Sequence, residues 1–262
     1  MIVEPGELAR HLGRADLLIV DLSERKGLTK RVRAPRCVPG AVHLDRSRIV
    51  AARPPAMGLV PDERQLREAL SSIGLTSETQ VIAYDDVGNT NACRFLWTLD
   101  LVGHSSFSLL NGGLGAWLDE GKPSERKFAQ PPPGDFEVVL QDDPIADKDY
   151  VRARLDDPGV VILDTRSPAE FSGGHIPGAV NMDWSLAVDA TRHSRLRSEA
   201  ELRGSLAQLG VEPAKEIITH CVVHLRSART YIVLKALGYP RIRGYPGSWS
   251  EWGNTPGLPT EH

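Results

Sequence analysis

The chain has 262 residues, 41% of them hydrophobic and 25% charged, and its formal net charge is −3. This length favours two domains of ordinary size, and the balanced charge argues against a nucleic-acid or membrane-surface partner. The three cysteines lie far apart and the histidines form no HExxH pair, so neither a disulfide framework nor a metal site is expected.

The N-terminal segment carries acidic residues early and has no long apolar run. It therefore has the features of neither a signal peptide nor a membrane span. We expect a cytoplasmic protein with reduced thiols and no membrane partner.

Predicted strands and helices alternate along the chain. Short aliphatic runs at 17–21 and 81–85 are typical of buried strands, and apolar residues at three- and four-residue spacing predict a helix over 63–73. The second half repeats the pattern, with a strand at 160–164 and a helix over 200–209. This alternation indicates an α/β fold with a mostly parallel, doubly wound sheet, in which ligands bind beyond the carboxyl ends of the strands.

The two halves of the chain repeat one another in sequence. VPGAVHLD at 38–45 matches IPGAVNMD at 176–183. Further pairs follow in the same order at a nearly constant offset: Asp85 with Cys221, Arg94 with Arg229, and Trp117 with Trp252. One repeat has the length of a domain. The prolines of DEGKPSERKFAQPPPGDFEVV indicate a semi-rigid linker between the repeats.

Cys221 ends the apolar run IITHC and is followed by a short loop and a predicted helix. The helix signals place the N-cap at Ser227 and the end near Gly238. A loop between a strand and a helix turns backbone N–H groups inward, and the helix N-terminus adds positive potential, so a thiolate or an anion can be held there. A cysteine after a strand is also often a small buried hydrophobe. The residues alone leave both roles of Cys221 open.

The sequence around Cys221 also mimics the His-Cys-x5-Arg loop of Cys-dependent phosphatases. That loop needs five intervening residues, so that its amides encircle a phosphate and its arginine clamps it. Only residues 222–225 separate Cys221 from Arg226. A shorter loop closes more tightly around the sulfur and suits a persulfide better. A phosphatase or arsenate reductase is therefore a less favoured alternative.

LDTRSPAEFSGGHIPGAVNMDW at 163–184 resembles the rhodanese signature, and CVVHLRS at 221–227 is similar to the active-site loop of that family. The first half is more loosely similar to the inactive first domain of tandem rhodaneses. The resemblance implies two tandem rhodanese-like domains, each a mostly parallel sheet flanked by helices. The expected limits are an inactive domain at 1–122 with Asp85 at the cysteine position, a Pro-rich linker at 123–143 and a catalytic domain at 144–262.

The resemblance implies a sulfurtransferase that needs no metal or organic cofactor. Cys221, matching the family's cysteine, takes the outer sulfur of a donor such as thiosulfate as a persulfide and passes it to cyanide or a thiol, in a ping-pong cycle. The expected partners are thus a small-molecule donor and acceptor, and the chain is expected to be a monomer. The candidate substrate-binding residues are Val222, Val223, His224, Leu225, Arg226, Ser227, Arg229 and Arg94.

Two positions depart from the family pattern. Glu170 stands where tandem members often carry an arginine that holds the substrate, so positive charge must come from Arg226, His224 or Arg229. His224 itself stands where glycine is common. The charged loop favours a compact dianion such as thiosulfate as donor, with 3-mercaptopyruvate as the alternative. A non-catalytic binding module is a further alternative, against which the intact cysteine loop argues.

Several other residues receive structural interpretations. Cys37 and Cys93 are predicted to pack in the cores, and His175 to form structural hydrogen bonds. Asp164 is predicted to organise its turn together with Arg166 rather than to act as a base.

Overall fold

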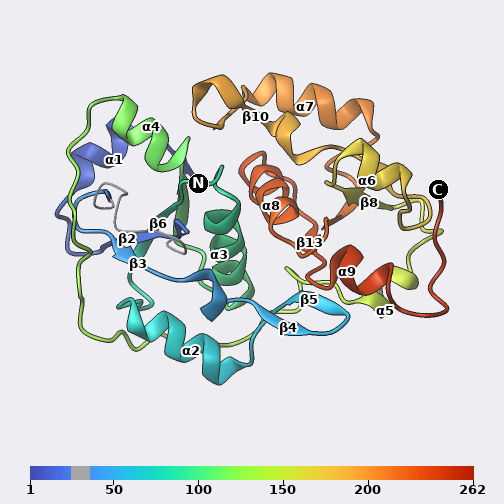
Figure 1. The fold of residues 1–262 in the computed structure, drawn as a ribbon, viewed down its shortest axis with the longest axis horizontal. Helices are drawn as coiled ribbons and strands as arrows, with labels where there is room; N and C mark the ends of the chain where they lie inside the picture. The colour runs from blue at the N-terminus through green and yellow to red at the C-terminus, as the bar shows by residue number, and fades with distance from the viewer. Residues whose placement is uncertain (25–35) are drawn as a thin grey trace, which may run out of the picture. The chain divides into compact units, whose positions relative to one another are not determined.

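The computed structural model describes residues 1–24 and 36–262, and the chain forms two compact α/β units (Figure 1). Each unit contains a short segment from the other half of the sequence. Unit 1 consists of Met1–Ile49, Pro61–Leu140 and Ala190–Arg195, and unit 2 of Val50–Val60, Gln141–Asp189 and Leu196–His262. The domain limits expected from the sequence remain a prediction.

Unit 1 is built on a parallel sheet with the strand order β1-β7-β6-β2-β3. Its strands are β1 (Ile2–Val3), β2 (Leu17–Asp21), β3 (Val42–His43), β6 (Gln80–Tyr84) and β7 (Phe107–Leu110). The accompanying helices are α1 (Pro5–His11), η1 (Arg46–Arg48), α2 (Glu63–Ser72), α3 (Thr90–Leu101) and α4 (Gly113–Asp119). The central strands are almost wholly buried, because helices cover both faces of a parallel sheet.

Unit 2 repeats this plan with the strand order β13-β12-β8-β9, again parallel. Its strands are β8 (Val160–Asp164), β9 (Val180–Asn181), β12 (Glu216–His220) and β13 (Ile242–Gly244). Its helices are α5 (Lys148–Arg152), α6 (Pro168–Ser172), η2 (Trp184–Ala187), α7 (Glu199–Gln208), α8 (Arg226–Ala236) and α9 (Ser248–Trp252). Helix α8 packs on β12 and β13, and it begins at Arg226, shortly after β12 ends at His220.

Two short ribbons and one short helix accompany the main sheets. β4 (Ala51–Arg53) and β5 (Ala56–Leu59) form an antiparallel hairpin in unit 2. β10 (Val188–Asp189) pairs with β11 (Arg195–Leu196), and η3 (Ala190–Arg192) lies between them. Both ribbons lie at the segments where the chain leaves one unit and enters the other.

The predicted α/β class, with one parallel sheet in each half, is confirmed. The strands predicted at 17–21 and 160–164 are found with those limits, and the strand predicted at 81–85 lies one residue earlier. The predicted helices correspond to α2 and α7 with shifts of one residue at their ends.

The internal repeat extends to individual side chains. Trp117 and Trp252 are both fully buried. Each indole donates its Nε1–H to the carbonyl of a proline a few residues later, at 2.7 Å to Pro123 and 2.8 Å to Pro259. Because the same contact closes both halves, the repeat in the sequence reflects a repeat in structure.

Within the residues that the structure describes, no helix has both the length and the apolar character needed to cross a bilayer.

Candidate active site

Cys221 lies directly after β12, and α8 begins five residues later at Arg226. The cysteine is almost fully buried, with 1% of its surface exposed. The N-cap predicted at Ser227 is wrong: Leu225 occupies the cap position and makes no side-chain cap bond. The Ser227 hydroxyl instead lies 2.7 Å from Nδ1 of His224, so it pairs within the loop rather than with the helix backbone.

Helix α9 holds the carbonyls at the start of the loop. The backbone N–H of Trp249 donates to the Cys221 carbonyl, and the N–H of Ser250 donates to the Val222 carbonyl, each at 3.0 Å. Because a trans peptide directs its C=O and N–H to opposite sides, the amides of Val222 and Val223 face away from α9. Two successive N–H groups are thus turned to the same side of the loop, as in an anion-binding nest.

Ser248 fixes the backbone of the cysteine itself. The Cys221 N–H donates to the Ser248 hydroxyl at 3.3 Å, and that hydroxyl donates to the Tyr245 carbonyl at 2.7 Å. Ser248 is fully buried and has a φ of 51°, in the left-handed region. A non-glycine residue with that φ costs conformational energy, which fits a position that is fixed by its contacts.

His224 is fully buried and adopts a φ of 52°, also in the left-handed region. Glycine takes this conformation without strain, which gives a physical reason for its frequency at this position in the family pattern. Here the contact between the His224 ring and Ser227 supports the same backbone turn.

Arg226 is one of the cations that the sequence analysis expects near the substrate, and it is paired with Glu170. Two hydrogen bonds join the Arg226 guanidinium to the Glu170 carboxylate, at 2.7 and 2.8 Å. The bond from Arg226 lowers the pKa of Glu170 to about 2, and the same bond raises the pKa of Arg226. The Cys221 thiol also interacts with this guanidinium. The site therefore carries a permanent ion pair beside its sulfur.

Helix α6 holds Glu170 through a capping box. Ser167 accepts a hydrogen bond from the Glu170 N–H at 3.3 Å, and the Glu170 carboxylate accepts one from the Ser167 N–H at 3.0 Å. These reciprocal bonds satisfy two N–H groups of the first helical turn. They also fix the carboxylate that orients Arg226.

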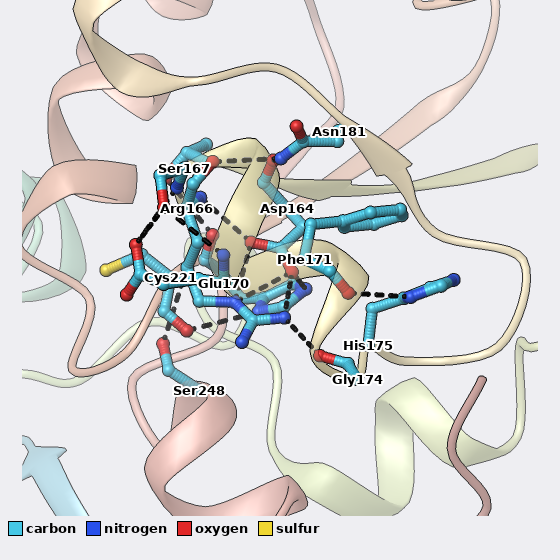
Figure 2. Close-up of polar contacts among 12 residues, drawn as sticks. Asp164, Arg166, Ser167, Glu170, Phe171, Gly174, His175, Asn181, Cys221 and Ser248 are labelled. Carbon is cyan, nitrogen blue, oxygen red and sulfur yellow. Dashed lines mark hydrogen bonds and ion pairs between the residues drawn. The ribbon is translucent and has the colours of Figure 1, made fainter. Parts of the chain in front are cut away.

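A second ion pair lies at the end of β8, next to the start of the loop that carries Cys221. Asp164 is paired in register with His220 and binds Arg166 at 2.6 Å, with both side chains buried (Figure 2). Arg166 also donates to the Gly174 carbonyl at 2.7 Å. Burial lowers the pKa of His220, whose Nε2 lies 3.6 Å from the Asp164 carboxylate. Asp164 and Arg166 thus organise the turn, in agreement with their predicted structural role.

The two other predicted arginines are buried against aromatic rings. Arg229 lies over the ring of Trp184, with 4.3 Å to its centroid, and donates to the Trp184 carbonyl at 2.6 Å. Arg94 belongs to unit 1 and lies over Trp97, with 4.6 Å to its centroid. Both have 1% or less of their surface exposed. Arg226, for its part, interacts with the Cys221 thiol.

Asp85 occupies the corresponding position in unit 1, directly after β6. Its carboxylate accepts hydrogen bonds from four backbone N–H groups of its loop and the first turn of α3: Val87 at 2.8 Å, Asn89 at 2.6 Å, Asn91 at 2.8 Å and Ala92 at 2.9 Å. The loop of unit 1 is therefore an anion nest that a side chain of the protein already fills.

Nothing in the sequence indicates that Glu170 pairs with Arg226 or that Ser248 binds the Cys221 amide. These partners are far apart in the chain, and neither pair has a spacing that a motif would reveal. Across the described ranges, no three His, Cys, Asp or Glu side chains gather closely enough to hold a metal ion.

Comparisons with known proteins agree with this geometry. The Rhodanese-like domain family matches residues 4–120 and 147–255, one match in each half. The chain belongs to the rhodanese family. The family predicted from the signature at 163–184 and from the cysteine loop is therefore confirmed.

Two relatives named thiosulfate sulfurtransferase cover the whole chain. The protein from Azotobacter vinelandii is 42% identical over 100% of this chain and 97% of its own length. The protein from Pseudomonas aeruginosa is 40% identical with the same coverage. SseA of Escherichia coli, one of the 3-mercaptopyruvate sulfotransferases, has the same fold, with a TM-score of 0.83 and 24% identity over 95% of this chain and 98% of its own.

Proposed function

We propose that this protein is a thiosulfate sulfurtransferase and that Cys221 is its nucleophile. The Cys221 thiolate attacks the outer sulfur of thiosulfate, the sulfur–sulfur bond of thiosulfate breaks, and sulfite leaves with the bonding electron pair. The cysteine then carries a persulfide. A second nucleophile, cyanide or a thiol, takes the terminal sulfur, and the thiolate is restored.

The surroundings of Cys221 carry this proposal. The cysteine lies in a loop whose carbonyls at 221 and 222 are bound by α9, so that the next two amides face the other side. Backbone N–H groups held in this way stabilise negative charge on a bound sulfur without having to reorganise. Arg226 adds a cation that interacts with the thiol. A cysteine that merely filled space would need none of these contacts.

The residues around Cys221 have different roles in the proposed reaction. The amides of Val222, Val223 and His224 bind the persulfide and the donor, and Arg226 provides the charge. Leu225 and Ser227 form the start of α8, where the helix dipole adds positive potential. Arg229 holds the structure around the loop within unit 2 through its contact with Trp184, and Arg94 makes the corresponding aromatic contact within unit 1.

The names of the relatives support thiosulfate as the donor. The two full-length relatives with 40% identity or more bear its name, whereas the likeness to SseA, at 24% identity, concerns the fold. A compact dianion also suits a loop with one guanidinium and several amides. We further propose a thiol as the cellular acceptor, and a monomer located in the cytoplasm as the working form.

Intact-mass spectrometry of the protein after thiosulfate treatment tests the proposal. We expect the wild type to gain the mass of one sulfur atom, to lose it on addition of cyanide, and to turn over thiosulfate with a higher kcat/KM than 3-mercaptopyruvate. Cys221→Ser should neither gain sulfur nor turn over, whereas Cys93→Ala, which removes a buried thiol of unit 1, should still gain it. A Cys221→Ser variant that retains sulfur transfer would contradict the proposal.

A further inference from the structure

The β4–β5 hairpin comes from the first half of the sequence but belongs to unit 2. Strand β5 packs against α9. The Met57 N–H donates to the Ser250 hydroxyl at 3.1 Å, and that hydroxyl donates to the Gly247 carbonyl at 2.8 Å. Ser250 also donates its own N–H to the Val222 carbonyl, so one residue of α9 connects the hairpin to the catalytic loop.

Gly58, the next residue of the hairpin, packs against the loop itself. A Cβ at this position would lie 2.3 Å from the Val223 carbonyl oxygen and 2.7 Å from the Pro246 carbonyl oxygen. Both neighbours are backbone atoms, which cannot move aside as a flexible side chain can. The backbone of Gly58 does not lie in the left-handed region. The requirement for glycine is therefore one of space between two stretches of backbone.

The Val223 carbonyl is thus the third in succession to have a neighbour on the outside of the loop. The carbonyls of Cys221 and Val222 are held by α9, and that of Val223 faces Gly58. Because the peptide is planar, the N–H of His224 must then point to the opposite side, with the amides of Val222 and Val223. A Cα–H directed at a carbonyl oxygen adds a weak attraction to this contact.

We propose that Gly58 is a positioning residue: the β4–β5 hairpin keeps the Val223–His224 peptide with its carbonyl outward, and so directs the His224 N–H at the sulfur bound to Cys221. The inference rests on the proposed role of Cys221 as the persulfide carrier. In this arrangement a segment from the first half of the sequence directly positions the Cys221 loop of the second half.

The equilibrium between free thiol and persulfide tests this inference on the full-length chain. Thiosulfate and the thiolate give the persulfide and sulfite, so the ratio of the two protein masses at fixed thiosulfate and sulfite reports the stability of the persulfide. We expect Gly58→Ala to lower that ratio by about tenfold or more, since loss of one aligned N–H donor weakens an anion site strongly. Ser250→Ala, which removes the hydroxyl bound by Met57, should lower it less.

Gly134→Ala in unit 1 is the matched control. Its Cβ would lie 1.9 Å from the Leu75 carbonyl oxygen, a similar clash with backbone, yet the persulfide ratio of the folded protein should stay at the wild-type value. A Gly58→Ala protein that folds and keeps the wild-type ratio overturns the inference. If Gly58→Ala does not fold, Ser250→Ala decides, and an unchanged ratio there overturns it. A wild type that forms no persulfide would instead refute the proposed function.

Discussion

The ion pair between Arg226 and Glu170 sets the electrostatics of the site at the scale of single residues. The carboxylate is bidentate on the guanidinium and stays ionised at neutral pH, because the pair lowers its pKa to about 2. An incoming dianion therefore meets a cation whose charge is largely balanced. Glu170 orients Arg226, and it also weakens the attraction of Arg226 for the donor.

Glu170→Gln should separate these two effects. The amide can still accept a bond from Arg226 and can still close the capping box with Ser167, but it carries no charge. We expect the KM for thiosulfate to fall by about threefold or more at low ionic strength, and the gain to shrink with added salt as screening increases. Steady-state kinetics at two salt concentrations provide the measurement.

Another ion pair of the same unit serves as the control. Glu199→Gln, which removes the exposed carboxylate bound to Arg203 on α7, should leave KM unchanged. If KM for thiosulfate rises in Glu170→Gln, orientation of Arg226 outweighs the charge, and the repulsion argument is wrong.

The two strand-to-helix loops show how one element serves two purposes. In unit 2 the loop after β12 carries a cysteine. In unit 1 the loop after β6 carries Asp85, whose carboxylate accepts hydrogen bonds from four backbone N–H groups of that loop and the first turn of α3. In unit 1 the Asp85 carboxylate is thus a built-in acceptor for the backbone N–H groups. In the proposed function, the loop of unit 2 gains such an acceptor when Cys221 carries a persulfide. Asp85 therefore satisfies the backbone N–H groups of unit 1 internally, and unit 1 has no thiol at this position.

The pH dependence of Asp85 follows from its burial. Burial raises its pKa to about 6, against the four N–H bonds that favour the carboxylate. An unfolded aspartate titrates near 3.9, so between about pH 4 and pH 6 the folded state binds more protons than the unfolded one. The contribution of Asp85 to the free energy of unfolding should therefore fall as the pH rises through this range.

Carbon-13 NMR of the aspartate carboxyls measures this directly. We expect one carboxyl resonance to titrate near pH 6 and to be missing in Asp85→Asn, which assigns it. A midpoint for that resonance near 4 would show that the four N–H bonds outweigh burial.

At the scale of the whole molecule, the two halves of the sequence exchange short segments. Residues 50–60 belong to unit 2, and residues 190–195 belong to unit 1. In unit 1 the exchanged segment is fixed by Arg195, which forms ion pairs with Glu4 and Glu120. Neither unit is thus completed by its own half of the chain.

A fragment containing only residues 141–262 should therefore be a poor sulfur acceptor. It has the whole loop around Cys221 but lacks the hairpin that contacts Val223 and Ser250. We expect it to form at least about tenfold less persulfide than the intact chain at equal thiosulfate, and to recover in part when residues 1–140 are added in trans. Intact-mass spectrometry measures the persulfide, and circular dichroism measures the folded fraction. A fragment as competent as the intact chain would show that the exchange is dispensable.

The sequence by itself determined the family, the α/β fold and the cysteine of interest. The strands at 17–21 and 160–164, the repeat and the CVVHLRS loop are all local patterns, and local patterns are readable because hydrophobic period and loop length depend on neighbours in the chain.

Only the tertiary structure decided which groups meet around that cysteine. Arg226 with Glu170, Ser248 with the Cys221 amide, and Gly58 with the Val223 carbonyl are contacts between residues that the sequence separates widely. Such pairs leave no periodic trace, because they arise from the packing of whole elements. The error in the predicted helix start has a local cause, because the Ser227 hydroxyl pairs with the His224 ring three residues earlier instead of capping α8.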